Sequence, residues 1–124
     1  MRRITEETRE NLVKLIVATI KPFKVEEVTA ALHEVGAAGV SLIEVRGWGR
    51  QRGHTEVYRG AEYRIDYLPK VRLEVLCDDG DVEKVQLAIA DAARTGSIGD
   101  GKIWVLDVDS ALRIRTGEVG IDAI

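Results

Sequence analysis

Apolar residues recur along the chain with two different periods, and these periods predict the secondary structure of its first half. Leu12–Ile20 is a run rich in β-branched residues, which is typical of a buried central strand. Pro22 ends this run. The stretch that follows predicts a helix closed by Gly36, because its apolar residues are spaced by three or four positions. These residues are Val25, Val28, Leu32 and Val35.

The same alternation of periods returns in the second half of the chain. Val40–Gly49 and Val71–Cys77 each alternate between apolar and polar positions, as strands do. Asp81–Thr95 carries a helical stripe and is followed by Gly96, and Lys102–Val108 predicts a last strand. The residues of this second helical stripe are Val82, Val85, Ile89 and Ala92.

The predicted order is strand, helix, strand, long loop, strand, helix, strand. Two β-α-β units in series predict an α+β domain of the ferredoxin-like βαββαβ type, with both helices on one face of an antiparallel sheet. The other face of such a sheet has to be covered. Because the domain is small, we expect a homo-oligomer in which self-association provides the cover.

The long loop, Gly49–Lys70, is the least regular part of the pattern. It is polar, contains glycines and three tyrosines, and is not expected to form ordinary secondary structure. Loops beyond about 12–15 residues are uncommon in compact domains and are usually functional or disordered. Either the strand assignment is therefore wrong or this loop is the functional segment. From Arg46 to Arg72, seven residues are basic and three are acidic, which favours a phosphate, a carboxylate or an acidic partner surface.

Composition narrows the class of protein. The 124 residues fit one domain, and the net charge of -3 argues against direct nucleic-acid binding. Cys77 is the single cysteine, so an internal disulfide is excluded, a cytoplasmic location is expected and the thiol is predicted to be buried. No apolar run approaches the ~18 residues that span a membrane. Residues 1–12 are charged and are interpreted as a flexible or weakly helical leader to a domain formed by residues 13–124.

The first candidate for chemistry is Thr95–Lys102, "TGSIGDGK". It matches the G-x-x-x-x-G-K core of a P-loop, but Ile103 stands where a Ser or Thr should hold magnesium, and the segment follows a helix and enters a strand, opposite to a P-loop. Its glycines still allow backbone amides to converge on a phosphate, to which Lys102 adds a point charge. The alternative is an ordinary glycine-rich turn between helix and strand.

The second candidate is the pair Arg113 and Arg115 in "RIRTG". In an extended segment both guanidinium groups would point the same way and suit phosphate oxygens, while the alternative is a solvated strand face. Together with the glycine-rich turn, the pair favours a polyphosphate ligand.

The third candidate is "GWGRQ", in which Gly47 and Gly49 permit close approach of a ligand and Gln51 offers an amide to a metal or a carboxylate. Its alternative is a bulge at the strand end with Trp48 packed in the core. No Ser/His/Asp set and no Cys/His cluster is found, and His33 and His54 are interpreted as solvated or loop residues. No catalytic residue is nominated, and we expect that the protein is not an enzyme.

Long strings of this sequence resemble the PII signal-transduction family, the nitrogen-regulatory proteins of the GlnB/GlnK type. The strings are "IKPFK", "GRQRGHTEVYRGAEY", "LPKV", "TGSIGDGKI" and "RIRTGE", and the likeness runs from Val13 to Ile124. The resemblance implies a ferredoxin-like homotrimer that binds ATP or ADP between subunits and senses 2-oxoglutarate. It also implies that the segment of about residues 49–70 is the family's T-loop, which inserts into partner proteins.

The resemblance implies the following site residues. Adenine and ribose would lie near Ser41 and Leu76, and Mg²⁺ would be held by the ATP phosphates, 2-oxoglutarate and the Gln51 side chain. The implied nucleotide-binding residues are Ser41, Arg50, Leu76, Gly99, Asp100, Gly101, Lys102, Arg113, Ile114 and Arg115. The implied 2-oxoglutarate-binding residues are Gly49, Arg50, Gln51, Arg52, Gly53 and Lys70.

Tyr63 in "RGAEY" matches the tyrosine that many bacterial members have uridylylated or adenylylated. The resemblance implies protein partners from nitrogen metabolism: an ammonium channel, a nucleotidyltransferase, metabolic enzymes or a sensor kinase, with membrane contact only through the channel. Ser97 departs from the usual Lys, which removes a charge near the phosphates, and Arg64 departs from a usually neutral residue. Two alternatives remain: an adaptor of PII type that binds nucleotide without sensing 2-oxoglutarate, and a slow ATPase.

Overall fold

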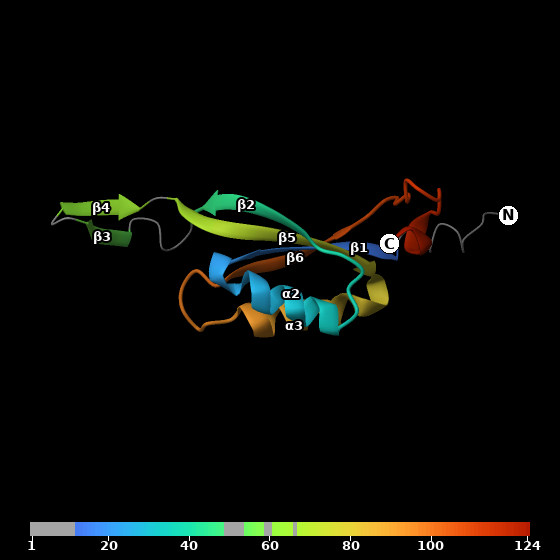
Figure 1. Ribbon diagram of the computed structural model, residues 1–124, viewed down its shortest axis with the longest axis horizontal. Helices are drawn as coiled ribbons and strands as arrows, with labels where there is room; N and C mark the ends of the chain where they lie inside the picture. Colours follow the sequence, from blue (N-terminus) through green and yellow to red (C-terminus); the bar gives the residue numbers. More distant parts are fainter. Residues whose placement is uncertain (1–11, 49–53, 59–60, 66) are drawn as a thin grey trace.

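The structure is a computed structural model that describes residues 12–48, 54–58, 61–65 and 67–124 (Figure 1). In this part of the chain, the two α-helices and the four strands of the main sheet follow one another in the predicted order, and a hairpin of two further strands lies between the second and third strands of that sheet. The strands and α-helices are β1 (Val13–Ile20), α2 (Val25–Glu34), β2 (Ser41–Gly47), β3 (His54–Tyr58), β4 (Ala61–Ile65), β5 (Leu68–Asp78), α3 (Val82–Ala93) and β6 (Gly101–Asp107). Short 3₁₀ helices are η1 (Pro22–Lys24), η2 (Asp79–Asp81) and η3 (Gly120–Ala123).

Within the described residues, β2, β5, β1 and β6 form an antiparallel four-stranded sheet in that order. Figure 1 shows α2 and α3 side by side on one face of this sheet, and no described helix on the other. This is the predicted ferredoxin-like arrangement, and β1 is a central strand as its continuous apolar run indicates.

The core lies between the helices and the sheet. Ile16, Ile20, Leu32, Leu73 and Ile89 are fully buried there, and each stabilises the fold by about 1.5–3 kcal/mol through the apolar surface removed from water. Cys77 joins this core, as predicted.

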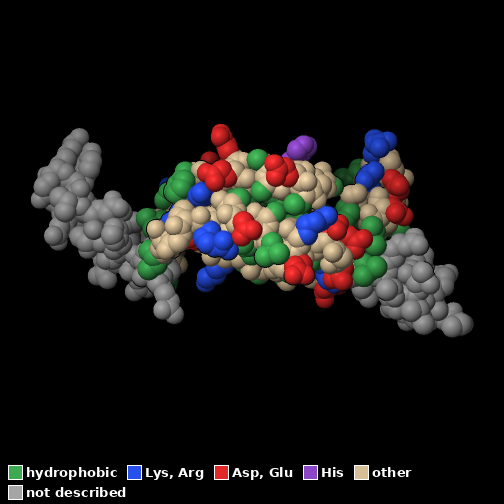
Figure 2. Space-filling view, turned by 90° about the horizontal axis from the view of Figure 1, so that it is seen from below, with side chains coloured by type: hydrophobic (Ala, Val, Ile, Leu, Met, Phe, Trp, Pro, Cys, Tyr) green, Lys and Arg blue, Asp and Glu red, His purple; other side chains and the backbone are tan. Residues whose placement is uncertain are grey.

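The opposite face of the sheet exposes apolar side chains. Register places Leu76, Leu15 and Leu106 in one row across β5, β1 and β6. The next row on this face contains Val17 and Trp104. Leu76, Leu106 and Trp104 remain exposed, so this uncovered face is apolar, as we expect of a face that packs against another chain. By contrast, the helix side displays acidic and basic side chains interspersed over the surface (Figure 2).

The prediction that residues 49–70 lack ordinary structure is wrong in part. β3 and β4 pair as an antiparallel hairpin, with Thr55 opposite Arg64 and Tyr58 opposite Ala61. β5 begins at Leu68, so Lys70 belongs to the sheet and not to the loop. The reason is composition, because "HTEVY" and "AEYRI" are rich in β-branched and aromatic residues and are separated by two residues that include a glycine.

Candidate functional site

The glycine-rich segment between α3 and β6 has a defined backbone shape. Gly96, Gly99 and Gly101 have φ angles of +85°, +88° and +111°, values that side-chain-bearing residues rarely adopt. At Gly101 there is a second constraint, because a Cβ atom there would overlap the carbonyl oxygen of Thr19. The turn therefore packs directly against the end of β1, and its three glycines cannot be replaced by residues with a side chain without strain.

The carboxylate of Asp100 is directed into this turn. It accepts hydrogen bonds from the backbone N–H of Thr95 at 2.8 Å and of Gly96 at 2.9 Å, and another from the Thr95 hydroxyl. Lys21, at the end of β1, adds an ion pair at 3.2 Å. The hydrogen bonds from Thr95, followed by those from Gly96 and Lys21, hold the pKa of Asp100 well below its usual range despite partial desolvation.

Lys70 connects β5 to the same turn. Its Nζ atom donates to the carbonyl oxygen of Gly99 at 2.6 Å, and the residue is only 8% exposed. Burial, aided by the positive charge of Lys21, lowers the pKa of Lys70, while the carboxylate of Asp100 opposes this shift. The ammonium group is thus buried against a neutral oxygen.

Backbone donors remain in the turn. The N–H groups of Thr95, Gly96 and Ser97 are used internally, whereas those of Ile98 and Gly99 donate to no other group within the described part of the chain. Adjacent backbone N–H groups of this kind form a concavity suited to an anion.

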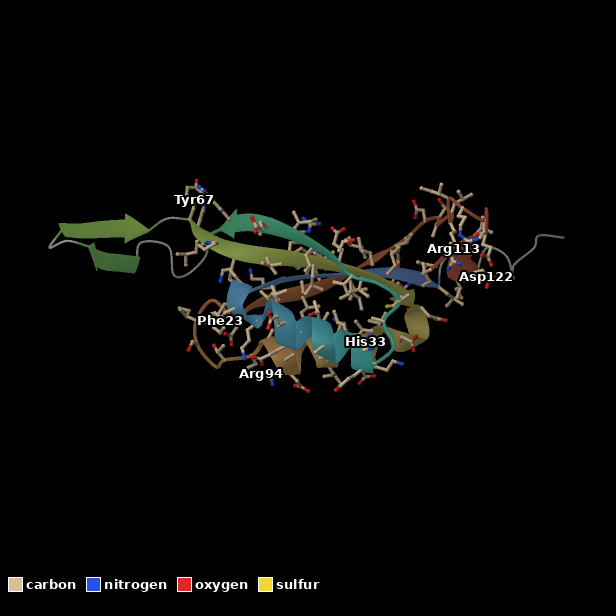
Figure 3. The ribbon with its side chains drawn as sticks, in the orientation of Figure 1. Phe23, His33, Tyr67, Arg94, Arg113 and Asp122 are labelled. Atoms are coloured by element: carbon tan, nitrogen blue, oxygen red, sulfur yellow. The ribbon has the colours of Figure 1, made fainter. Side chains whose placement is uncertain are left out.

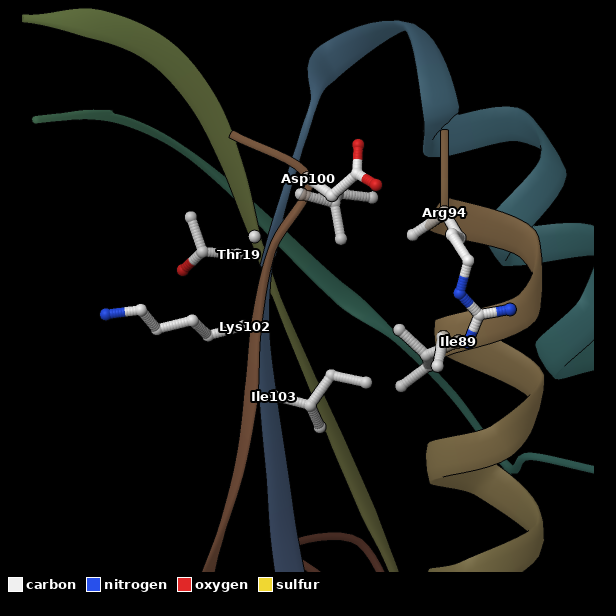
Figure 4. A pocket seen from close by; sticks show the side chains of 10 residues that line it. Thr19, Ile89, Arg94, Asp100, Lys102 and Ile103 are labelled. Carbon is white, nitrogen blue, oxygen red and sulfur yellow. The ribbon is translucent and has the colours of Figure 1, made fainter. Parts of the chain in front are cut away.

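A hollow of about 250 Å³ adjoins the turn between α3 and β6. Figure 4 shows Ile89 and Ile103 pointing into the space between helix and strand, while Lys102 points away on the other side of β6. Lys102 is exposed and pairs with Thr19, so its side chain extends on the uncovered face of the sheet, although the residue also contributes to the lining of this hollow.

A second hollow, of about 470 Å³, contains both residues that were expected near adenine and ribose. Ser41 and Leu76 line it together with Leu15, Glu74 and Ile124, among others. The structure therefore brings Ser41 and Leu76 together although they are far apart in sequence.

The predicted geometry of Arg113 and Arg115 is wrong. Residues 114–116 form a turn, in which the N–H of Gly117 donates to the carbonyl of Arg113 at 2.8 Å, so the segment is not extended. Arg113 is directed inward to the carbonyl oxygens of Ala123 and Ile124, at 3.3 and 3.1 Å from its Nε and Nη2 atoms. The turn exists because residues 112 and 119 pair as an isolated bridge, a long-range contact that the spacing of two arginines does not reveal.

Other predicted residues are placed as follows. Arg115 is exposed, and Ile114 is 95% exposed, so the Ile114 side chain makes little contact with the described part of the chain. Trp48 is exposed, which contradicts the alternative that it packs in the core. The predictions on residues 49–53 lie outside the described residues. Tyr63 lies in β4, where its backbone pairs with Glu56.

Together, the placed residues divide into two groups at opposite ends of the sheet. Tyr67 and the start of β5 lie at the end of the sheet that carries the β3–β4 hairpin, and Lys70 in β5 bonds to the glycine-rich turn there. Arg113 lies at the other end, far from Tyr67, with the C-terminal segment (Figure 3). The strand register shows how far apart the two ends are. Leu106 pairs with Leu15 and Lys102 pairs with Thr19, and these two partners on β1 are four residues apart, which corresponds to about 13 Å along the strand. One chain does not gather all the predicted nucleotide-binding residues into one cleft.

Lys21 and Thr95 were not identified from the sequence as site residues. The hydroxyl–carboxylate spacing from Thr95 to Asp100 is a local signal that a side chain closes the turn. Lys21 offers no such signal, because it is 74 residues from Thr95, to which it donates at 3.1 Å.

Comparison with known proteins decides the family. The family model described as "Nitrogen regulatory protein P-II" matches residues 13–118. The chain belongs to the nitrogen regulatory protein P-II family. PII proteins similar to this chain include those of Azospirillum brasilense and Rhizobium meliloti, 59% and 58% identical over 112 residues that cover 90% of this chain and all of each relative. The PII fold also appears in a solved Arabidopsis thaliana PII bound to citrate, which is 34% identical, has a TM-score of 0.76 and covers 92% of this chain and 94% of that one.

The PII relatives are named as regulatory proteins, which fits the absence of a nominated catalytic residue. Among the described residues, no helix is long and apolar enough to cross a membrane.

Proposed function

We propose that this protein is a trimeric sensor that binds ATP or ADP and, with Mg-ATP, 2-oxoglutarate, and that it regulates proteins of nitrogen metabolism through the segment between β2 and β5. Membership of the PII family supports the regulatory role. We place the PII domain at residues 13–124 and a leader at residues 1–12.

The observation that carries the proposal is the environment of Lys70. A buried ammonium group is costly unless an opposite charge compensates it, and here its hydrogen-bond partner is the neutral carbonyl of Gly99. The neighbouring carboxylate of Asp100 is already bound to Lys21 and to the turn. Among the described residues no carboxylate contacts the Lys70 ammonium group directly, and the distal carboxylate of 2-oxoglutarate would supply that counter-charge. The Arabidopsis PII structure contains citrate, an acid of related chemistry, which supports a carboxylate ligand.

For the nucleotide, the N–H groups of Ile98 and Gly99 and the exposed ammonium of Lys102 are donors suited to phosphate oxygens. Ser41 and Leu76 line the second hollow and would receive the adenosine. The hollow of Ser41 and Leu76 also contains Ile124, which accepts a hydrogen bond from Arg113, so the adenosine residues lie at the same end of the sheet as the arginines. The glycine-rich turn lies at the other end. A complete site therefore requires one copy of the chain to supply the turn and a second copy to supply the adenosine hollow, Arg113 and Arg115.

The uncovered sheet face supports assembly into a homotrimer. It presents Leu76, Leu106 and Trp104 to solvent, and it holds Arg72, whose buried Nε atom has no hydrogen-bond partner within the described chain. A second copy packed on this face would bury the apolar side chains and offer an acceptor to Arg72.

The residues fit a metal that arrives with its ligands. The described residues contain no group of His, Cys, Asp and Glu arranged to hold a metal ion. Mg²⁺ would therefore be held by oxygens of ATP and 2-oxoglutarate and by Gln51, which lies outside the described residues. Its chemistry there would be to link the two ligands, so that each strengthens the binding of the other.

Regulation would proceed through the T-loop, and its β3–β4 hairpin carries Tyr63, the proposed site of nucleotidylylation. A nucleotidyl group would add bulk and a negative charge where the hairpin meets a partner. We propose cytoplasmic partners from nitrogen metabolism, including an ammonium channel, without direct binding of nucleic acid.

The test is calorimetric titration of ATP into the protein with Mg²⁺, with and without 2-oxoglutarate, repeated with ADP. The proposal expects 2-oxoglutarate to bind only in the presence of Mg-ATP and to tighten ATP binding, with no such effect on ADP. Binding of ATP without any effect of 2-oxoglutarate would favour an adaptor that senses nucleotide alone. Steady release of phosphate that is lost in Lys102→Ala would favour the slow ATPase.

A further inference from the structure

The glycine-rich turn is tied to three separate parts of the fold by a polar cluster that consists of Lys21, Thr95 and Asp100. Lys21 follows β1, Thr95 follows α3 and Asp100 precedes β6. The Nζ atom of Lys21 lies 3.2 Å from the Asp100 carboxylate and 3.1 Å from the Thr95 hydroxyl, and the Lys21 and Asp100 side chains are largely shielded by their neighbours.

Each hydrogen bond of this cluster fixes a different part of the turn. Asp100 accepts from the N–H groups of Thr95 and Gly96, which joins the end of the turn to its beginning. The Thr95 hydroxyl donates to Asp100 and accepts from the N–H of Ser97 at 3.1 Å. The donors at the start of the turn are thereby used internally, and those of Ile98 and Gly99 are left for a ligand.

Lys70 fixes the remaining peptide. It holds the carbonyl of Gly99 at 2.6 Å, and in a trans peptide unit the carbonyl and the following N–H point in opposite directions. The orientation of the peptide between Gly99 and Asp100 is therefore set before any ligand binds.

The negative charge of Asp100 is also compensated within the cluster. A carboxylate beside a phosphate site would repel the ligand, but this one is paired with Lys21 and bonded to backbone donors. Its oxygens face inward to the turn. If Asp100 contacts the nucleotide, as the resemblance implies, we therefore expect the contact to come from its backbone and not from its side chain.

We propose that Lys21, Thr95 and Asp100 are positioning residues that preset the glycine-rich turn for the nucleotide phosphates, without touching the ligand through their side chains. This inference rests on the proposed nucleotide binding and deepens it. A preset turn loses less conformational freedom when phosphate binds, and this raises affinity without a new contact.

The test compares ADP affinity by calorimetry in Thr95→Val, Thr95→Ser and Asp100→Asn. Valine keeps the shape of Thr95 but removes the hydroxyl, serine retains the hydroxyl, and asparagine places an NH₂ group against backbone donors. We expect Thr95→Val and Asp100→Asn to weaken ADP binding by about tenfold or more, the equivalent of a hydrogen-bonded contact or two, and Thr95→Ser to stay within about twofold of the unchanged protein.

Two control substitutions remove similar groups away from the turn. Thr29→Val deletes a hydroxyl that bonds to backbone carbonyls within α2, and Asp81→Asn deletes a carboxylate from an exposed ion pair with Lys84 just before α3. Both controls should bind ADP as the unchanged protein does, with thermal unfolding measured in parallel for every variant.

The outcomes separate the two proposals. If the unchanged protein does not bind ADP, the proposed function itself fails. If it binds ADP and Thr95→Val and Asp100→Asn bind equally well, the positioning role is overturned, as it is if Thr95→Ser is as weak as Thr95→Val. If Asp100→Asn does not fold, the comparison of Thr95→Val with Thr95→Ser still decides the matter.

Discussion

The Nζ atom of Lys70 lies 2.6 Å from the carbonyl oxygen of Gly99, although the two residues are 29 positions apart. Lys70 lies in β5 and Gly99 lies in the glycine-rich turn, so this hydrogen bond connects the two segments for which we propose ligand binding. A ligand carboxylate that pairs with Lys70 would compete with Gly99 for the ammonium group. The state of the turn and the base of the loop are then coupled through one side chain.

Replacing Lys70 with methionine tests this coupling. Methionine preserves the length and apolar stem of the side chain but removes the ammonium group. We expect Lys70→Met to bind Mg-ATP about threefold to tenfold more weakly than the unchanged protein in the absence of 2-oxoglutarate, because the Gly99 peptide loses the hydrogen bond that orients it. The affinity for 2-oxoglutarate should fall by about thirtyfold or more, since a truncated buried charge pair typically costs 2–5 kcal/mol. Calorimetric titration measures both quantities.

Lys84→Met serves as the matched control, because Lys84 forms an exposed ion pair with Asp81 on the helix side. It should leave both affinities unchanged. Retention of 2-oxoglutarate binding by Lys70→Met would contradict the assignment of Lys70 as the partner of the ligand carboxylate.

The lowered pKa of Lys70 predicts a pH dependence of ligand binding. As pH rises, the folded protein loses the ammonium charge of Lys70 at this lowered pKa, whereas the unfolded chain keeps the charge up to the ordinary pKa of 10.5. In that window the unfolded chain binds more protons than the folded one, so the contribution of Lys70 to folding stability rises with pH. Binding of 2-oxoglutarate should weaken across the same window, because the cation it needs disappears. Titrations from pH 7 to about 10 check this, and Lys70→Arg, which stays charged, should give a flatter profile.

The close packing of the turn against β1 predicts an unequal response of two glycines to alanine. Gly36 and Gly101 both have positive φ, but only Gly101 would place a Cβ atom onto the backbone of Thr19. Gly36→Ala should cost about 1–2 kcal/mol of unfolding free energy from its backbone conformation alone. Gly101→Ala should cost about 3 kcal/mol or more, because the start of β6 must move away from the end of β1. Urea unfolding of the two variants provides the comparison, and equal losses would show that the contact with Thr19 relaxes freely.

The sequence predicts most of this fold because its apolar periods are uninterrupted. The runs in β1 and α3 have one period each, and the glycines after α2 and α3 mark where the helices end. The β3–β4 hairpin is not predicted because its strands are short and polar, and the polar character of Gly49–Lys70 obscures the β-branched and aromatic residues within it. The start of β5 at Leu68 is not predicted because Pro69 lies within the strand, and proline is typical of a loop or a strand edge.

The candidate site is less accessible to sequence reasoning because its contacts are non-local. The glycines of the turn signal a backbone site, and Lys102 signals charge, but neither reveals that Lys21 and Lys70 meet at this turn. The inward orientation of Arg113 depends on carbonyls ten and eleven residues further along the chain. Such contacts arise from tertiary packing, which no local pattern encodes.

Burial of Cys77 predicts an unreactive thiol. Desolvation, with smaller contributions from Asp81, Asp78 and Asp79, raises the pKa of the thiol from 9.0 to about 11. At pH 8 the thiolate fraction should be about a hundredfold lower in the folded protein than in the unfolded one. Modification by iodoacetamide should therefore be slower by about that factor or more than in urea. Because the unfolded thiol releases its proton first, the contribution of Cys77 to stability should decline as pH rises above 9.0. Equal rates in both states would show that the core opens readily at this strand.

The uncovered sheet face predicts where a single charge prevents assembly. Leu106 is 47% exposed in a row with Leu15 and Leu76 on this face, whereas Leu87 is 55% exposed on α3. A leucine-to-glutamate substitution can therefore be compared at two positions with similar exposure in the single chain, one on the uncovered sheet face and one on a helix. Leu106→Glu should convert an oligomer with the mass of three chains into monomers, because a carboxylate buried in an apolar interface without a partner costs several kcal/mol. Leu87→Glu should remain assembled. Sedimentation velocity distinguishes these outcomes, and an intact oligomer of Leu106→Glu would place the interface elsewhere than on this face.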